Sequence, residues 1–111
     1  MNFIATENKG FRMKFENGFE ISVQWGTMNY CEKKNLMAEY KNEMKERTWE
    51  SRNAEIAVFD TNGELLPIGE NDAVIGWLTP NEVAKVIAIV SSAKDKYEII
   101  GTIQSLPLER P

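Results

Sequence analysis

Tryptophan, arginine, tyrosine and asparagine side chains are the residues of this chain best suited to hold a flat ligand that carries negative charge. Such a ligand needs an aromatic platform, guanidinium groups and backbone N–H donors. Trp77 precedes a predicted helix whose first turn includes Asn81, and free N–H groups at a helix start attract anions. Arg52 and Arg110 lie in segments without a periodic pattern, where binding side chains concentrate, and Tyr30 lies in a glycine-containing loop. These five residues are the candidate ligand-binding residues.

A plainer structural role competes with the binding role at each of these positions. An aromatic side chain is more often part of a core, and a single arginine is more often a solvated surface cation. Tyr30 has the further alternative of a half-buried lid on the core at the end of a strand. At the helix start, Pro80 removes one N–H donor and Glu82 is unfavourable for a bound anion. Residue type alone therefore favours the plainer roles.

Histidine is absent and Cys31 is the one cysteine of the chain. The commonest general base and the commonest metal ligand are therefore both missing, and no Ser-His-Asp or Cys-His arrangement can form within this chain. Cys31 itself is expected to be a small buried residue rather than a nucleophile. We accordingly expect a protein that binds rather than catalyses, with no metal and no cofactor.

Length and charge narrow the class of protein further. A chain of 111 residues is expected to form a single domain over 1–111, and 42% hydrophobic with 27% charged residues is typical of a globular protein. A net charge of −4 disfavours binding to duplex nucleic acid, and 13 bases interleaved with 17 acids disfavour a DNA mimic. No apolar run is long enough to span a membrane and the start lacks the features of a signal peptide. With a lone cysteine, these features favour the cytoplasm.

A β-hairpin over residues 11–25 is the first of the elements predicted to position the candidate residues. Apolar and polar residues alternate strictly on both sides of Asn17-Gly18. A two-residue loop would mix apolar and polar groups on each face, whereas a three-residue loop pairs Phe15 with Phe19. We therefore predict a type I turn over Glu16-Asn17 with Gly18 in the left-handed region as a bulge. A short edge strand is also predicted over Phe3 to Ala5.

A second hairpin is predicted over residues 53–68, with Gly63 at the left-handed position of its turn. Its register would place Phe59 opposite Leu65, Val58 opposite Leu66 and Ile56 opposite Ile68. Pro67 cannot donate to a ladder, so this arm should run at an edge or end early.

The strongest helix signal begins at Thr79, which with Glu82 completes a capping box around Pro80. This amphipathic helix should extend over about residues 80–93 and cover one sheet face. A second helix over about residues 36–47 is the favoured interpretation of an ambiguous stretch, followed by polar, loosely held residues to Asn53. Residues 97–103 resemble a last, C-terminal strand with Gly101 as a bulge, and the apolar tail after it should pack on the protein or on a second subunit. The predicted fold is thus α+β: an antiparallel sheet of two hairpins and a C-terminal strand against one capped helix.

Three blocks of sequence resemble small proteins encoded by phages and prophages. They are F-x-N-G-x-x-I-S-V-Q-W-G-x-x-N-Y-C at 15–31, A-E-I-A-V-F-D-x-N-G at 54–63 and G-W-L-T-P-N-E-V at 76–83. By size and predicted make-up the chain is also similar to the first family of phage anti-Thoeris sponge proteins. That resemblance implies a homo-oligomer that binds cyclic ADP-ribose isomers or cyclic oligonucleotides between subunits without cleaving them. It further implies an aromatic on the base and arginines on the phosphates, for which Trp77, Arg52 and Arg110 match by role.

The leading hypothesis from the sequence is therefore a phage anti-defence protein that sequesters a nucleotide second messenger of host immunity. The alternative is a protein-binding inhibitor of a host defence enzyme, similar in role to an anti-CRISPR. An enzyme that degrades the same messenger is the third and least favoured hypothesis.

Overall fold

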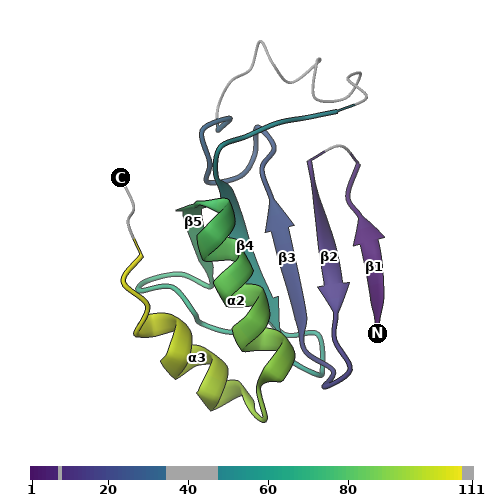
Figure 1. Cartoon of the computed structure of the whole chain (residues 1–111), viewed down its shortest axis with the longest axis vertical. Coiled ribbons are helices and arrows are strands. Elements are labelled where there is room, and N and C mark those ends of the chain that lie inside the picture. The colour runs from purple at the N-terminus through teal and green to yellow at the C-terminus, as the bar shows by residue number, and fades with distance from the viewer. Residues whose placement is uncertain (8, 35–47, 109–111) are drawn as a thin grey trace.

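The computed structural model describes residues 1–7, 9–34 and 48–108. Within them the chain has the predicted α+β fold, with an antiparallel five-stranded sheet and helices α2 and α3 on one of its faces (Figure 1). The strands are hydrogen-bonded in the order β1-β2-β3-β4-β5, so each pairs with its neighbours in sequence. The elements are β1 Asn2–Ala5, β2 Gly10–Lys14, β3 Glu20–Gln24, β4 Ala54–Phe59, β5 Val74–Leu78, α2 Pro80–Ser92 and α3 Lys96–Gln104.

The first hairpin has the predicted three-residue loop. The Phe15 N–H donates to the Phe19 carbonyl at 2.8 Å, and the Gly18 N–H donates to the Phe15 carbonyl at 2.9 Å. Gly18 has φ +90°, in the left-handed region where glycine carries no Cβ penalty. Met13 lies opposite Ile21, so apolar side chains share one face, as the alternation predicted. The predicted edge strand is also confirmed, since among the described strands β1 pairs only with β2.

The second turn forms as predicted, but its return arm is short. Gly63 has φ +80° and Phe59 forms an isolated bridge with Leu65. The expected pairing of Ile56 with Ile68 is wrong, because Ile56 lies opposite Ile75 of β5 instead. Pro67 offers no N–H to a ladder, so the chain leaves β4 there and β5 takes the adjacent position. Ile68 is still buried in the core, with 1% of its surface exposed.

Helix α2 has the capping box that the sequence predicted. The Thr79 side chain accepts from the Glu82 N–H at 3.3 Å, and the Glu82 carboxylate accepts from the Thr79 N–H at 2.9 Å. Pro80 occupies the first helical position and Ala93 is the C-cap. Its buried stripe of Val83, Val86 and Val90 packs on the sheet, and burying each such side chain stabilises the fold by about 1.5–3 kcal/mol. Among the described strands, α2 contacts β3, β4 and β5.

Residues 97–103 are not a strand, because they form helix α3. Asp95 is the N-cap and its side chain accepts from the Glu98 N–H at 2.9 Å, while the Glu98 carboxylate accepts from the Lys94 N–H at 2.8 Å. Ile99 and Ile103, four residues apart, are both buried against the core. The helix start at Asp95 and this spacing outweigh the strand preference of the isoleucines. The C-terminal strand of the sheet is therefore β5, which the two helices follow.

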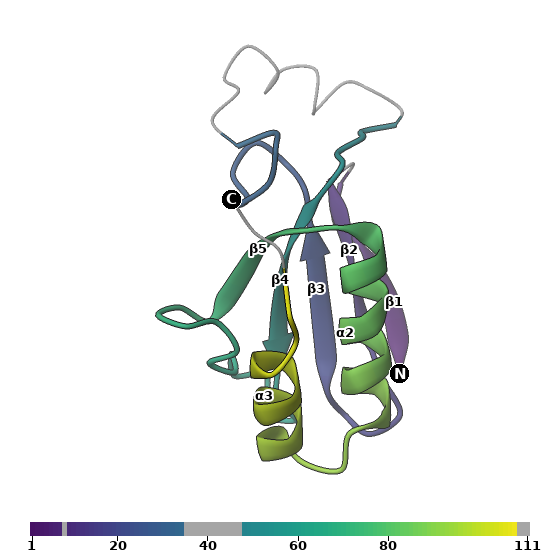
Figure 2. The same cartoon turned by 60° about the vertical axis from the view of Figure 1, so that its left-hand side comes forward.

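The two faces of the sheet differ in cover (Figure 2). The helix face carries Phe11, Ile21, Val23, Ile56 and Ile75, and α2 and α3 lie against it. No helix of the described chain covers the opposite, helix-free face.

On the helix-free face, a cross-strand row runs from Ile4 through Arg12, Ser22 and Ala57 to Val74. The Arg12 guanidinium forms an ion pair with Glu20 and lies 4.5 Å from the centre of the Phe59 ring. This face is therefore held by polar and cation–π contacts instead of a second helix layer.

The predicted helix over 36–47 lies outside the described residues. In the described part of the chain, neither helix is long and apolar enough to span a bilayer. Thr48 to Asn53 are not loosely held, since Trp49 is buried with 9% of its surface exposed and Ser51 to Asn53 make specific hydrogen bonds.

Candidate functional site: an apolar groove at the start of helix α2

Several chain segments meet at one end of the sheet. Strand β3 ends there, β4 begins there, and β5 ends there and leads directly into α2 (Figure 1). The loops after β3 and before β4 therefore lie next to the start of α2. We call this end of the sheet the loop end, and it is defined by residues 25–34, 48–53 and 77–81.

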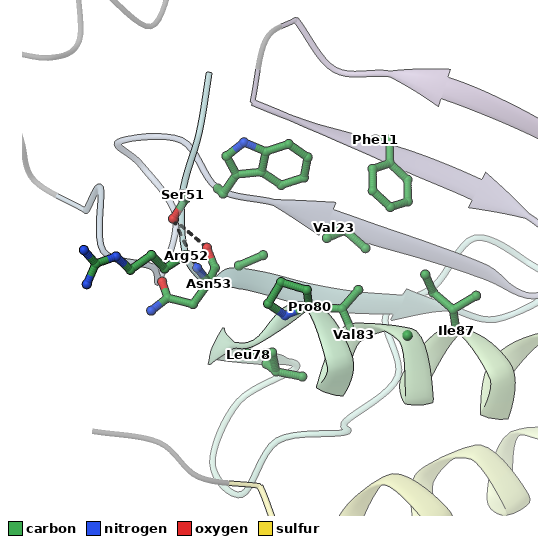
Figure 3. A pocket seen from close by; sticks show the side chains of 12 residues that line it. Phe11, Val23, Ser51, Arg52, Asn53, Leu78, Pro80, Val83 and Ile87 are labelled. Carbon is green, nitrogen blue, oxygen red and sulfur yellow. Dashed lines mark hydrogen bonds between the residues drawn. The ribbon is translucent and has the colours of Figure 1, made fainter. Parts of the chain in front are cut away.

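A groove of about 300 Å³ opens at the loop end, on the helix face of the sheet. One side is formed by β2 and β3 and the other by the first two turns of α2 (Figure 3). Its lining is predominantly apolar, which suits a flat hydrophobic or aromatic group. The lining residues are Phe11, Val23, Trp25, Ser51, Arg52, Asn53, Ala54, Leu78, Pro80, Val83, Ala84 and Ile87.

Two aromatic rings form the sheet side of this groove. Phe11 and Trp25 meet edge to face, with ring centroids 6.2 Å apart and an interplanar angle of 69°. The Trp25 indole N–H donates to the Trp49 carbonyl at 2.8 Å, and the Trp49 indole N–H donates to the Trp25 carbonyl at 3.1 Å. Because its one donor is used, the Trp25 ring meets the groove with carbon atoms and a π surface. The hydrogen bonds between Trp25 and Trp49 thus hold the Trp25 ring in place from outside the groove.

The mouth of the groove is formed by Ser51, Arg52 and Asn53. The Ser51 hydroxyl donates to the Asn53 carbonyl at 2.7 Å. Glu32 ties this segment to the preceding loop, because its N–H donates to Asn53 Oδ1 at 2.7 Å and its carboxylate accepts from the Arg52 N–H at 2.9 Å. The Arg52 guanidinium extends outward from the mouth (Figure 3), is 91% exposed and lies 3.9 Å from the Glu32 carboxylate. The backbone here is fixed, while the cation is solvated and able to reorient.

The start of α2 borders the same groove through Pro80. Pro80 has no N–H, and the Glu82 and Val83 N–H groups bond to the side chain and carbonyl of Thr79. Of the N–H groups in the first turn, that of Asn81 is therefore the one that takes no part in the capping hydrogen bonds. Asn81 itself is exposed and its side chain does not line the groove. The Glu82 carboxylate partly offsets the positive end of the helix here.

Tyr30 and Trp77 form a separate aromatic pair at the loop end. Their ring centroids are 5.5 Å apart, and the Trp77 N–H donates to the Tyr30 carbonyl at 2.9 Å. The Tyr30 N–H donates to the Glu55 carboxylate at 3.0 Å. Glu55 precedes Ile56 in β4, and because the Ile56 side chain is on the helix face, the Glu55 side chain is on the helix-free face. The Tyr30 backbone therefore lies against the helix-free face, whereas the groove opens on the helix face. Lys34 lies 5.0 Å from the centre of the Tyr30 ring.

The backbone of this pair is tightly constrained. Trp77 has φ +56°, in a region that non-glycine residues rarely occupy, next to a bulge in the β4–β5 ladder. Gly76 precedes it because a Cβ there would meet the Tyr30 Cβ and lie 2.8 Å from the Tyr30 carbonyl oxygen. The local conformation is therefore held by close packing of the two segments.

The candidate residues of the sequence analysis fall at different places. Tyr30 and Trp77 come together, Arg52 lines the groove mouth, and Asn81 lies in the first turn of α2. Arg110 lies outside the described residues. The structure thus divides the four described candidates between the groove side and the helix-free side of the loop end.

Phe11 and Trp25 line the groove but were not predicted from the sequence as binding residues. The predicted register could have identified them. Phe11 lies opposite Val23, and Trp25 follows Val23 by two residues and so lies on the same face. That register places both aromatic rings at the last inward positions of the first hairpin.

Cys31 lies in the loop after β3 and is buried, as predicted, with 2% of its surface exposed. Its thiol donates to the Gly26 carbonyl at 3.5 Å. Burial is the main cause that raises the pKa of the Cys31 thiol, although hydrogen bonds with the Lys33 backbone and Ser51 lower it. The thiol is therefore protonated near neutral pH, which disfavours a nucleophilic role. In the described residues, no group of three or more His, Cys, Asp or Glu side chains is placed to hold a metal ion.

Comparison of the chain with protein-family models, with curated proteins and with solved structures gave no match.

Proposed function

We propose that this protein acts by holding a ligand in the groove beside α2 without converting it. The observation that carries this proposal is the chemistry of the lining, because Arg52 is the one ionisable side chain among the described residues that line the groove. The guanidinium group offers N–H donors and no acceptor, so Arg52 can bind an anion but cannot act as a general base. The Ser51 hydroxyl would need an adjacent base to become a nucleophile, and the described lining residues include none.

We further propose that the ligand is a nucleotide second messenger, either a cyclic ADP-ribose isomer or a cyclic oligonucleotide. A base would enter between Trp25 and the first turns of α2, where aromatic and apolar surface is worth about 1–3 kcal/mol per stacked base. The phosphates would lie at the mouth, within reach of the Arg52 guanidinium and the Asn81 N–H. The resemblance to phage sponge proteins supports the same ligand class. The protein would then sequester a host immune signal in the cytoplasm.

Titration calorimetry of the purified chain against cyclic ADP-ribose isomers and cyclic oligonucleotides tests this function. We expect saturable binding of one of these ligands, and absence of heat with all of them would reject the proposal. Denaturing the complex should release the ligand chemically unchanged. Recovery of a cleaved product would instead favour an enzyme.

Two matched alanines on α2 test the location. Ala84 lines the groove, whereas Ala88 is exposed on the same helix outside the lining. Ala84→Leu should fill the groove and weaken binding by roughly tenfold or more, the loss expected when about 1.4 kcal/mol of contact is removed. Ala88→Leu should leave the affinity unchanged. Equal affinities for the two variants would place the ligand elsewhere on the protein.

The contribution of the mouth is measured by Arg52→Gln, which removes the charge and keeps a polar side chain. A charge-assisted contact with phosphate predicts roughly tenfold weaker binding and a smaller salt dependence. Lys85→Gln on the exposed side of α2 is the control for net charge, and it should leave the affinity within about twofold.

A further inference from the structure

Within residues 1–7, 9–34 and 48–108, strand β1 has no strand paired with its outer edge, so main-chain groups there are unpaired. Thr6 and Gly10 form a hydrogen-bonded pair, since the Thr6 N–H donates to the Gly10 carbonyl at 3.0 Å. In an antiparallel ladder such pairs alternate with non-hydrogen-bonded ones. Ile4, opposite Arg12, therefore bonds toward β2, while the N–H and C=O groups of Phe3 and Ala5 point away from it. Phe3 and Ala5 form the free edge.

The side chains of β1 are those of an interior strand. Phe3 lies on the helix face and is 78% exposed, and Ile4 lies on the helix-free face and is 41% exposed. Met1, just before the strand, is 83% exposed. Edge strands are usually protected by charged residues, proline or a bulge, and β1 has none of these. An exposed apolar edge strand without such protection is a template for pairing with a further strand.

The other edge of the sheet is protected in a way that β1 is not. At β5, the Trp77 N–H donates to the Tyr30 carbonyl and the backbone turns at φ +56°. The β4–β5 ladder also contains a register shift between Ala54 and Ile56. A bulged and covered edge does not accept a further strand, so continuation of the sheet is favoured at β1 alone.

We propose that β1 pairs in antiparallel fashion with β1 of a second copy of this chain, about a two-fold axis perpendicular to the sheet. In the register that uses both free edge residues, Phe3 lies opposite Ala5 of the second copy and Ile4 lies opposite Ile4. The Phe3–Ala5 pairs then exchange roughly four main-chain hydrogen bonds. The axis keeps the helices of both copies on the same face of one continuous sheet.

The sequence of β1 is complementary to itself in this register. The large Phe3 ring lies beside the small Ala5 side chain on the helix face, and the two Ile4 side chains contact each other on the helix-free face. Asn2 lies opposite Thr6, which matches polar with polar. The strand has no charge, so two copies do not repel each other where they meet. This self-complementarity is why a second copy is favoured over an unrelated strand.

Light scattering coupled to size exclusion, from micromolar to several hundred micromolar protein, measures the assembly. We expect a mass of two chains at the upper concentrations. Ala5→Pro removes one outward N–H while leaving the β1–β2 bonds intact, so it should return the mass to one chain. Tyr97→Lys alters an exposed aromatic residue on α3, outside the proposed interface, and should leave the dimer unchanged. A single-chain mass of the unaltered protein throughout, or a dimer that persists in Ala5→Pro, would overturn the proposal.

Cysteine cross-linking tests the register in a folded dimer, using a Cys31→Ala background. Directly opposed non-hydrogen-bonded pairs have Cα atoms about 4.5 Å apart, within the range of a disulfide. Ile4→Cys should therefore cross-link quickly under mild oxidation. Phe3→Cys is the matched control, because the two Phe3 positions are offset along the strand by about 7 Å. Cross-linking of Phe3→Cys as fast as Ile4→Cys would contradict this register, and a dimer absent from both variants would contradict the interface.

Discussion

The side-chain amide of Asn17 donates to the backbone carbonyl of Val90 at 2.8 Å, and also to that of Ala93 at 3.0 Å. The turn of the first hairpin therefore caps the C-terminal end of α2, where carbonyls lack partners within the helix. Asn17 Oδ1 accepts from the Phe19 N–H at 3.1 Å, so the same side chain also holds its own turn. One residue thus fixes the orientation of the hairpin relative to the helix that borders the groove.

Replacing Asn17 with aspartate should destabilise the protein by about 2–3 kcal/mol. The change removes the donors to Val90 and Ala93 and places a carboxylate at the negative end of the helix dipole. Urea unfolding at neutral pH measures the difference. Asn62→Asp is the matched control, because Asn62 also precedes a left-handed glycine but is exposed in a turn of its own. Equal losses in the two variants would show that the turn, and not the cap, explains the effect.

The reciprocal hydrogen bonds between Trp25 and Trp49 should be coupled. Trp25→Phe and Trp49→Phe each remove one indole N–H and leave a part-buried carbonyl without its partner, so each should cost about 1–3 kcal/mol. Since each bond helps to hold the residue that accepts the other, the double variant should lose less than the sum of the single losses, by about 0.5–3 kcal/mol. Urea unfolding of the four proteins gives this coupling. Strict additivity would show that the two bonds act independently.

Trp77→Phe is the control for loss of a tryptophan as such. The Trp77 contacts that hold the loop end are its backbone N–H and its ring contact with Tyr30, both of which a phenylalanine keeps. Its unfolding free energy should therefore change by less than about 1 kcal/mol. The comparison separates the Trp25–Trp49 pair from aromatic burial in general.

The elements that were predicted correctly are those whose signals are local in sequence. The first hairpin follows from alternation around Asn17-Gly18, and α2 follows from the capping box at Thr79. Both signals lie within a few residues of the structure they specify. The cap that Asn17 provides for α2 could not be predicted in the same way, because it depends on where the helix ends in space.

The wrong prediction for residues 97–103 arose where two local preferences compete and core burial favours one of them. Residues 97–103 are rich in isoleucine, which favours a strand, but Asp95 and Glu98 start a helix and Ile99 and Ile103 are buried by it. The site was incompletely predicted for a similar reason. Trp77 was favoured because it precedes the helix start, whereas Trp25 lines the groove because the hairpin folds under α2.

Two glycine-to-alanine substitutions should have opposite effects on stability. Gly101 lies in α3 and a Cβ there meets no atom within 4 Å, so Gly101→Ala should stabilise by about 0.5–1 kcal/mol. A Cβ at Gly76 would meet Tyr30, whose carbonyl oxygen lies 2.8 Å away, so Gly76→Ala must separate β5 from the loop. We expect a loss of about 1–3 kcal/mol and a change in tryptophan fluorescence. Stabilisation by both substitutions would contradict the close contact at Gly76.

The Cys31 thiol should make stability fall at alkaline pH. Burial raises its pKa above the ordinary value of 9.0, so the folded state keeps the proton to higher pH than the unfolded state. The stabilisation is therefore complete below the unfolded pKa and is lost as pH rises from there toward the folded pKa, with a slope of at most about 1.4 kcal/mol per pH unit. Cys31→Ala removes this titration and leaves every other ionisable side chain in place. Urea unfolding of both proteins between about pH 7.5 and about pH 10 should thus show a steeper decline for the unaltered chain, and parallel declines would mean that the thiol ionises equally in both states.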